Sequence, residues 1–116
     1  MDLQVGRQLG QLRPADTTAA SVFSPVAGQR AEITRIYVCN QTAGALQYRV
    51  FHDEDGTTYD ETTALYFDIS IPANNTVGLF NLGLWMADSS GNLGVRTSAG
   101  NGITFTVYGI EHDMVA

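Results

Sequence analysis

One stretch decides the fold of this 116-residue chain: Gly102-Ile103-Thr104-Phe105-Thr106-Val107-Tyr108-Gly109. Its apolar side chains recur at every second position, with threonine or tyrosine between them. Successive side chains of a strand point to opposite faces, so a period of two indicates a strand with one face on a hydrophobic core. We therefore predict that Ile103, Phe105 and Val107 line the core.

The segment at residues 64–71 repeats this alternation. Leu65, Phe67, Ile69 and Ile71 share one face, and a tyrosine, an aspartate and a serine share the other. The proline that follows has no N–H to donate and ends the strand. The pattern predicts that these four apolar side chains also face the core.

Clusters of turn-forming residues separate the apolar runs at intervals of roughly 8–12 residues, as in sandwich and barrel folds. They occupy residues 40–44, 53–56, 73–75, 88–92 and 98–102. The sequence thus predicts an all-β protein, an antiparallel β-sandwich of the jelly-roll kind with about 7–8 strands. We expect one domain overall, with residues 1–28 as an N-terminal strand or arm and residues 29–116 as the sandwich.

Residues 31–40 differ from the other runs because they are apolar on both faces. Ile33, Tyr37 and Cys39 fall on one face, and Ile36 and Val38 fall on the other. A large apolar patch is rare on a monomer, so we expect a further subunit to cover one face. Ile36 and Val38 are predicted interface residues, and the chain is predicted to form a homotrimer or another closed oligomer.

The charge balance excludes some partners. The formal net charge is −6, with 12 acidic residues and six basic ones. So few cations neutralise few phosphates, and we expect no nucleic-acid partner. No apolar run approaches the length of a membrane helix or resembles a signal peptide, so we expect no membrane partner and synthesis in a cytoplasm. The single Cys39 allows no internal disulfide.

Every basic residue is an arginine, and lysine is absent. Arginine is favoured where a charge is packed or paired, although a codon bias would give the same composition. Arg7 and Arg13 lie in the segment with the least core-forming sequence. We predict that they form ion pairs with carboxylates of a partner subunit.

No arrangement of residues points to catalysis. His52 and His112 have no neighbouring nucleophile in a recognised motif, so we expect no enzyme activity and no cofactor. The acidic run at residues 53–61 offers Asp53, Asp55 and Asp60 as candidate calcium ligands, but its spacing departs from a calcium loop. We expect an exposed hairpin loop there and no metal site.

Trp85 is the only tryptophan of the chain. Beside Asp88 and Asn92 it could serve a sugar-binding module as a stacking platform. The surrounding leucines and methionine favour an anchor in the core or in an interface, and we predict Trp85 as an interface residue.

A wider resemblance rests on four segments together: residues 33–40, 71–76, 93–98 and 103–111. In these runs and turns the chain resembles the small β-sandwich structural proteins of tailed phages, notably capsid decoration (cement) proteins, over residues 29–111. The resemblance implies a location on the virion, usually as a trimer where capsomers meet. Its partners would be itself and the major capsid protein or other virion subunits. A carbohydrate- or receptor-binding module of a phage tail or fibre is the competing hypothesis.

Overall fold

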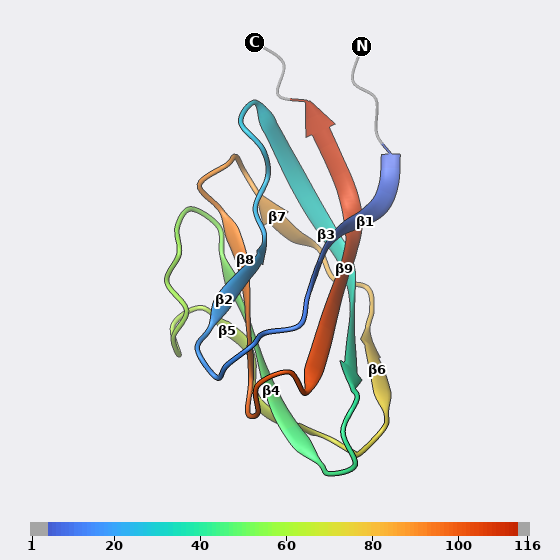
Figure 1. The fold of residues 1–116 in the computed structure, drawn as a ribbon. Helices are drawn as coiled ribbons and strands as arrows, with labels where there is room; N and C mark the ends of the chain where they lie inside the picture. The colour runs from blue at the N-terminus through green and yellow to red at the C-terminus, as the bar shows by residue number, and fades with distance from the viewer. Residues whose placement is uncertain (1–4, 114–116) are drawn as a thin grey trace.

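The computed structural model describes residues 5–113, which form nine strands and no helix (Figure 1). Residues 1–4 of the predicted N-terminal segment and 114–116 of the predicted sandwich lie outside this range. None of the described residues forms a helix that could span a membrane. The strands are β1 (Val5–Leu12), β2 (Ala20–Phe23), β3 (Gln29–Asn40), β4 (Leu46–Asp53), β5 (Ala64–Ile71), β6 (Thr76–Leu79), β7 (Leu84–Met86), β8 (Asn92–Thr97) and β9 (Ile103–Asp113).

The strands form two antiparallel sheets. Sheet I has the order β1-β9-β3, with both β6 and β7 paired to the far side of β3; sheet II has the order β2-β8-β4-β5. The chain pairs β1 with β9, β2 with β8, β3 with β6 and β7, and β4 with β5. This nested pairing is one long antiparallel hairpin rolled into two sheets, which is the jelly-roll topology. The predicted all-β sandwich is confirmed.

The core lies between the two sheets. Ile103, Phe105 and Val107 on β9 are all fully buried, as the alternation predicted. The other buried side chains of this core cluster come from most of the remaining strands: Phe23, Ala31, Ile33, Ile36, Val38, Tyr48, Val50, Ile71, Met86, Leu93 and Val95. Seven of the nine strands therefore contribute a fully or almost fully buried side chain to one molecule.

A bulge in β3 corrects the prediction for residues 31–40. The register with β9 shifts between Ile33 and Arg35, so Thr34 is an extra residue that reverses the alternation. Ile33, Ile36 and Val38 all face the core with 0% exposure. The expected second apolar face formed by Ile36 and Val38 is therefore wrong, because both side chains already have partners within their own chain.

A second bulge corrects the prediction for residues 64–71. Tyr48 pairs with Ile69 and Val50 pairs with Tyr66, so Phe67 and Asp68 stand together opposite one residue of β4. Asp68 has a φ of 53°, in the left-handed region. Tyr66, in place of Phe67, packs against the core.

Of the four side chains predicted to face the core on β5, only one is buried. Ile71 has 0% exposure, whereas Leu65, Phe67 and Ile69 are 45%, 38% and 41% exposed. Leu65 and Phe67 flank the inward Tyr66 and therefore lie on the outer face of sheet II. Ile69 stands opposite the buried Tyr48 but belongs to an edge strand, so part of it reaches solvent.

Asn40 ties two turns together at the end of β3. It is 1% exposed, and its amide nitrogen lies 2.9–3.1 Å from the carbonyl oxygens of Gly44, Ile71 and Pro72. Its Oδ1 accepts hydrogen bonds from the backbone N–H and the hydroxyl of Thr42, at 2.9 and 2.8 Å. The β3–β4 turn is thereby joined to the end of β5.

Replacing Phe105 by alanine is expected to reduce the free energy of unfolding by about 3–5 kcal/mol, because the ring is fully buried and its removal leaves a cavity. Leu65→Ala is the matched control at an exposed site and is expected to cost less than about 1 kcal/mol. Urea unfolding of the two variants measures the difference. Equal losses would mean that the β5 side chains face the core after all.

Candidate interaction surfaces

The outer face of sheet II carries an apolar row on β5. Leu65 and Phe67 project from it, and Ile69 on the same strand is also partly exposed, at the edge of the sandwich. Because β5 is the last strand of sheet II, its outer N–H and C=O groups have no neighbouring strand within the described residues. Apolar side chains thus coincide with a free strand edge, a combination that favours pairing with another chain.

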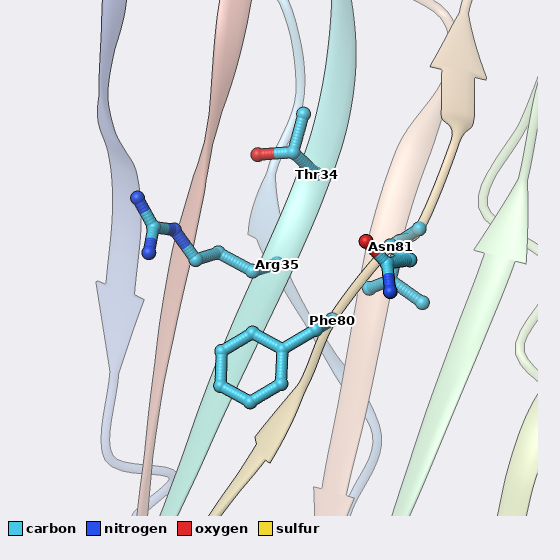
Figure 2. A pocket seen from close by; sticks show the side chains of 5 residues that line it. Thr34, Arg35, Phe80 and Asn81 are labelled. Carbon is cyan, nitrogen blue, oxygen red and sulfur yellow. The ribbon is translucent and has the colours of Figure 1, made fainter.

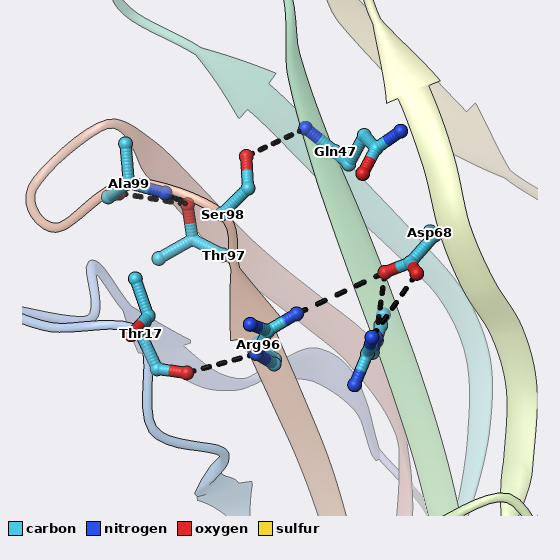
Figure 3. Close-up of polar contacts among 8 residues, drawn as sticks. Thr17, Gln47, Asp68, Arg96, Thr97, Ser98 and Ala99 are labelled. Atoms are coloured by element: carbon cyan, nitrogen blue, oxygen red, sulfur yellow. Dashed lines mark hydrogen bonds and ion pairs between the residues drawn. The ribbon is translucent and has the colours of Figure 1, made fainter.

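An ion-pair network fixes the bulge beneath this row. Arg49 binds both carboxylate oxygens of Asp68, with Nε 2.6 Å from Oδ1 and Nη2 3.0 Å from Oδ2. Arg96 lies 3.8 Å from the same carboxylate and donates to the carbonyl oxygen of Thr17 at 2.9 Å (Figure 3). The Arg49 guanidinium also lies 3.8 Å from the ring centroid of Phe67. The network therefore orients an exposed aromatic ring and holds an otherwise unusual backbone conformation.

The same network acts on the Asp68 carboxyl. The hydrogen bonds from Arg49 hold the pKa of Asp68 below its usual value, with further lowering by the charges of Arg49 and Arg96. Burial opposes this effect. Asp68 therefore remains ionised in the folded protein to a lower pH than in the unfolded chain.

The outer face of sheet I carries a second, aromatic surface. The ring of Tyr37 meets Phe80 and Tyr108 edge to face, each with ring centroids 5.7 Å apart. The Arg35 guanidinium lies 5.5 Å from the Tyr108 ring centroid. Phe80 is 55% exposed. This cluster is separated from the β5 row because it lies on the opposite sheet.

Two hollows open on this aromatic surface, and Thr34 and Arg35 line both. The first, of about 370 Å³, is also lined by Phe80 and Asn81 (Figure 2). The second, of about 430 Å³, is bordered by Arg7, Tyr108 and Ile110. The β3 bulge at Thr34 therefore lies where the two hollows meet.

The acidic loop folds back over the outer face of sheet II. Asp53 is 9% exposed and accepts hydrogen bonds from the N–H groups of Asp55 and Thr58, at 3.2 and 2.8 Å. These bonds, chiefly that from Thr58, lower the pKa of Asp53. The ring of Tyr59 covers Gly94, where a Cβ would lie 2.5 Å from the ring. The absence of a side chain at Gly94 on β8 thus lets the loop pack against the sheet.

Of the candidate calcium ligands Asp53, Asp55 and Asp60, the first and the last accept hydrogen bonds from backbone N–H groups of the loop. Asp60 accepts a hydrogen bond from the N–H of Thr62 at 2.8 Å, and the Thr62 side chain lowers its pKa. Within residues 5–113, no group of three or more His, Cys, Asp or Glu side chains is placed to hold a metal ion.

The two histidines take part in packing at one end of the sandwich. His52 lies with Nε2 2.8 Å from the carbonyl oxygen of Trp85, which joins sheet II to β7 of sheet I. His112 is 6% exposed, and its ring centroid lies 5.4 Å from that of Trp85. Both contacts position Trp85.

The five predicted interface residues have different surroundings. Ile36 and Val38 are buried in the core, as described above. Arg7, on β1, forms an ion pair with Glu111 on β9 of its own chain. Arg13 is exposed and makes no hydrogen bond or ion pair with the residues that the structure describes. Trp85 is 41% exposed.

The alternative sugar platform at Trp85 does not assemble as predicted. Asn92 is 8% exposed and is held by Ser21 Oγ, by Gly56 and by the carbonyl oxygen of Ser90. Asp88 caps its own turn through the N–H of Ser90 at 2.9 Å. The exposed face of Trp85 lies instead beside Arg30, whose guanidinium is 5.8 Å from the ring centroid.

No protein-family model matches the chain, and no curated protein matches it in sequence. Two structures of the tobacco streak virus coat protein are similar to it at 10% identity, with TM-scores of 0.48 and 0.49. Both alignments cover 99% of this chain and 86% of the coat protein. A structure of infectious bursal disease virus, Gx strain, is similar at 15% identity and a TM-score of 0.40, over 96% of this chain and 29% of that chain.

The thermal stability of the protein is expected to fall as the pH drops from about 5 to about 3. Asp53, Asp60, Asp68 and Asp88 have lowered pKa values in the folded state, so the stability that they contribute is present above their ordinary pKa and is lost on protonation.

Asp68→Asn tests one of these groups. The variant should melt below the wild type at pH 7, and the two melting temperatures should converge in acid, because protonation removes the Arg49 ion pair from the wild type as well. Glu54→Gln, at an exposed carboxylate of the acidic loop, is the control. If the difference in melting temperature between the wild type and Asp68→Asn stayed constant with pH, the stabilising role of the Asp68–Arg49 ion pair would be contradicted.

Proposed function

We propose that the chain is a structural protein of a virus particle, a capsid decoration protein of the tailed-phage kind, which forms a closed oligomer and binds the outer shell of the head. The observation that carries the assembly is the apolar row of Leu65 and Phe67 on β5, the edge strand of sheet II, where Ile69 is also partly exposed. The two halves of the proposal, self-association and attachment to a shell, rest on different grounds.

Self-association follows from the chemistry of β5. Exposed apolar surface and unpaired backbone groups both gain free energy when a second copy covers them. The Phe67 ring lies against the Arg49 guanidinium, so this side chain is already held in place before a partner arrives. A preformed surface loses less side-chain entropy on binding than a mobile one.

The bulge at Phe67 and Asp68 limits how the row can associate. A bulge bends a strand and interrupts its regular hydrogen-bonding groups. An added strand therefore finds only short regular stretches on either side of Asp68, which disfavours an extended sheet of many copies. Side-chain contact around this point favours a small closed assembly, and a trimer fits this requirement.

Attachment to a virus head is supported by the topology together with the sequence resemblance. Jelly rolls occur among viral capsid domains and lectins, and a topology alone does not fix a function. The resemblance to decoration proteins in residues 29–111 favours a viral structural role over a lectin role. Copies joined through β5 would keep the outer face of sheet I free for a further partner.

The purified chain is expected to have the mass of an oligomer at micromolar concentration, measured by light scattering after size exclusion. Leu65→Glu should yield a folded monomer, because a charge in the row cannot be desolvated without cost. Val26→Glu is the matched control: Val26 is 61% exposed but lies in the β2–β3 loop, so this variant should keep the wild-type mass. A monomeric wild type, or an oligomeric Leu65→Glu, would refute the assembly surface.

Particles produced with and without the gene test the attachment. The wild-type particles are expected to carry the chain in many copies on the head, seen by electron microscopy and mass spectrometry. Particles that lack it should assemble but lose their contents at a lower temperature, and added protein should restore the resistance. Absence of the chain from intact particles, or its presence at the tail alone, would contradict a decoration role.

A second candidate function is a carbohydrate- or receptor-binding module of a phage tail or fibre. It is favoured by one specific observation, the aromatic surface of Tyr37, Phe80 and Tyr108 with the hollows beside Arg35. Location at the tail in the particle experiment would support this candidate over the first.

A further inference from the structure

Phe80 forms a flat, accessible platform on the outer face of sheet I. Its ring lies directly over Gly78 of β6, where a Cβ would come within 2.3 Å of Cζ. Only glycine at this position lets the ring lie against the strand. The T-shaped contact with Tyr37, at an interplanar angle of 81°, helps to hold the ring in place. The ring nevertheless remains 55% exposed, so much of its surface is open to solvent.

The turn that follows Phe80 is fastened to the β3 bulge. Asn81 has a φ of 57°, in the left-handed region that asparagine tolerates better than most residues. The N–H of Leu82 then donates to the carbonyl oxygen of Thr34 at 3.1 Å. Figure 2 shows Thr34 and Arg35 projecting from β3, and Phe80 and Asn81 from the segment after β6. Two separate elements therefore form one hollow in a fixed arrangement.

Arg35 has its hydrogen-bonding groups available in this hollow. Arg7, Arg49 and Arg96 each lie within ion-pair distance of a carboxylate of their own chain. The Arg35 side chain is exposed and forms no hydrogen bond or ion pair among residues 5–113; its guanidinium lies against the Tyr108 ring. Arg13 and Arg30 likewise have no carboxylate partner among the described residues, but of these three arginines only Arg35 lines the two hollows. Its planar fork matches a carboxylate ligand.

The two hollows together can hold more than one ring of a ligand. They share Thr34 and Arg35, so Arg35 stands between them. Their volumes of about 370 and 430 Å³ lie in the range of small-molecule sites. An extended ligand can therefore pass from Phe80 across Arg35 toward Tyr108.

We propose that these hollows bind a glycan that contains a carboxylated sugar. The C–H face of a sugar ring stacks on the electron-rich face of Phe80, and the carboxylate of the same or the next sugar pairs with Arg35. The exposed ring favours a glycan over an acidic protein segment, because a carboxylate alone needs no platform. This inference concerns sheet I and stands independently of the assembly through β5 and of attachment to a head.

Binding is tested first with matched pairs of probes on the full chain. Oligogalacturonate is compared with its methyl ester, and sialyllactose with lactose, by calorimetry, after a screen on an array of acidic and neutral glycans. The carboxylated member of at least one pair is expected to bind at least about tenfold more tightly than its neutral counterpart. The affinity should fall as the salt concentration rises. Failure of every carboxylated glycan on the array to bind above its neutral counterpart would overturn the proposal.

Variants then assign the binding to the two residues. Phe80→Ala and Arg35→Gln are each expected to weaken binding by about tenfold or more, and Arg35→Lys should recover only part of the affinity. Arg13→Gln and Val26→Ala, at exposed positions away from the hollows, should bind like the wild type. Unchanged binding by Phe80→Ala and by Arg35→Gln, at unchanged melting temperatures, would overturn the site.

A polyglutamate peptide distinguishes the other source of carboxylates. Binding of the peptide that equals that of the glycan and is insensitive to Phe80→Ala would identify an acidic protein partner and overturn the glycan proposal. Phe80→Ala and Arg35→Gln should still form the wild-type oligomer and decorate heads, so the two proposals succeed or fail separately.

Discussion

The ladder between β3 and β9 holds the two longest strands together, from Gln29 opposite Asp113 to Asn40 opposite Ile103. Every other strand of sheet I pairs with one of these two strands. β1 pairs with β9, and β6 and β7 both pair with β3. Its inner side chains form much of the core that sheet II covers. The ladder is also where the surface chemistry begins, because its bulge at Thr34 creates the meeting point of the two hollows. Folding and the aromatic surface therefore depend on the same pair of strands.

The alternation of apolar residues was sufficient to predict the class of fold and the core face of β9, since these require only a period of two and polar turns. It failed where a bulge adds one residue. Thr34 and Phe67 are ordinary strand formers, so no residue type marks either position as irregular. Each bulge reverses the faces that follow or precede it, which moved Ile36 into the core and left Leu65 on the surface. A single extra residue thus places a predicted interface residue in the core, as at Ile36, or a predicted core residue on the surface, as at Leu65.

The candidate surfaces were harder to predict than the fold, because they depend on contacts between distant parts of the sequence. The absence of lysine predicted ion pairs of Arg7 and Arg13 with a partner subunit; within the chain, Arg7 pairs instead with Glu111, and Arg49 pairs with Asp68. Their partners, Glu111 and Asp68, could not be named without the strand order. Arg35 differs from Arg7 and Arg49 because it follows the β3 bulge and lies against the Tyr108 ring, without a carboxylate partner among the described residues. No pattern in the sequence marked Phe80 as an exposed surface residue. Its position depends on Gly78, which has no side chain where the ring lies.

The pairing of β1 with β9 has a practical consequence for how the molecule can be extended. Val5 stands opposite Glu111, so β1 begins beside the end of β9, at the opposite end of the ladder from the Asn40 corner. Any peptide joined ahead of β1 or behind β9 leaves from that one end (Figure 1). A short linker between the two would permit circular permutation, with new ends in the turns beyond β3. A linker from Asp113 to Val5 would cross only this end of the sandwich and leave the broad faces of both sheets clear.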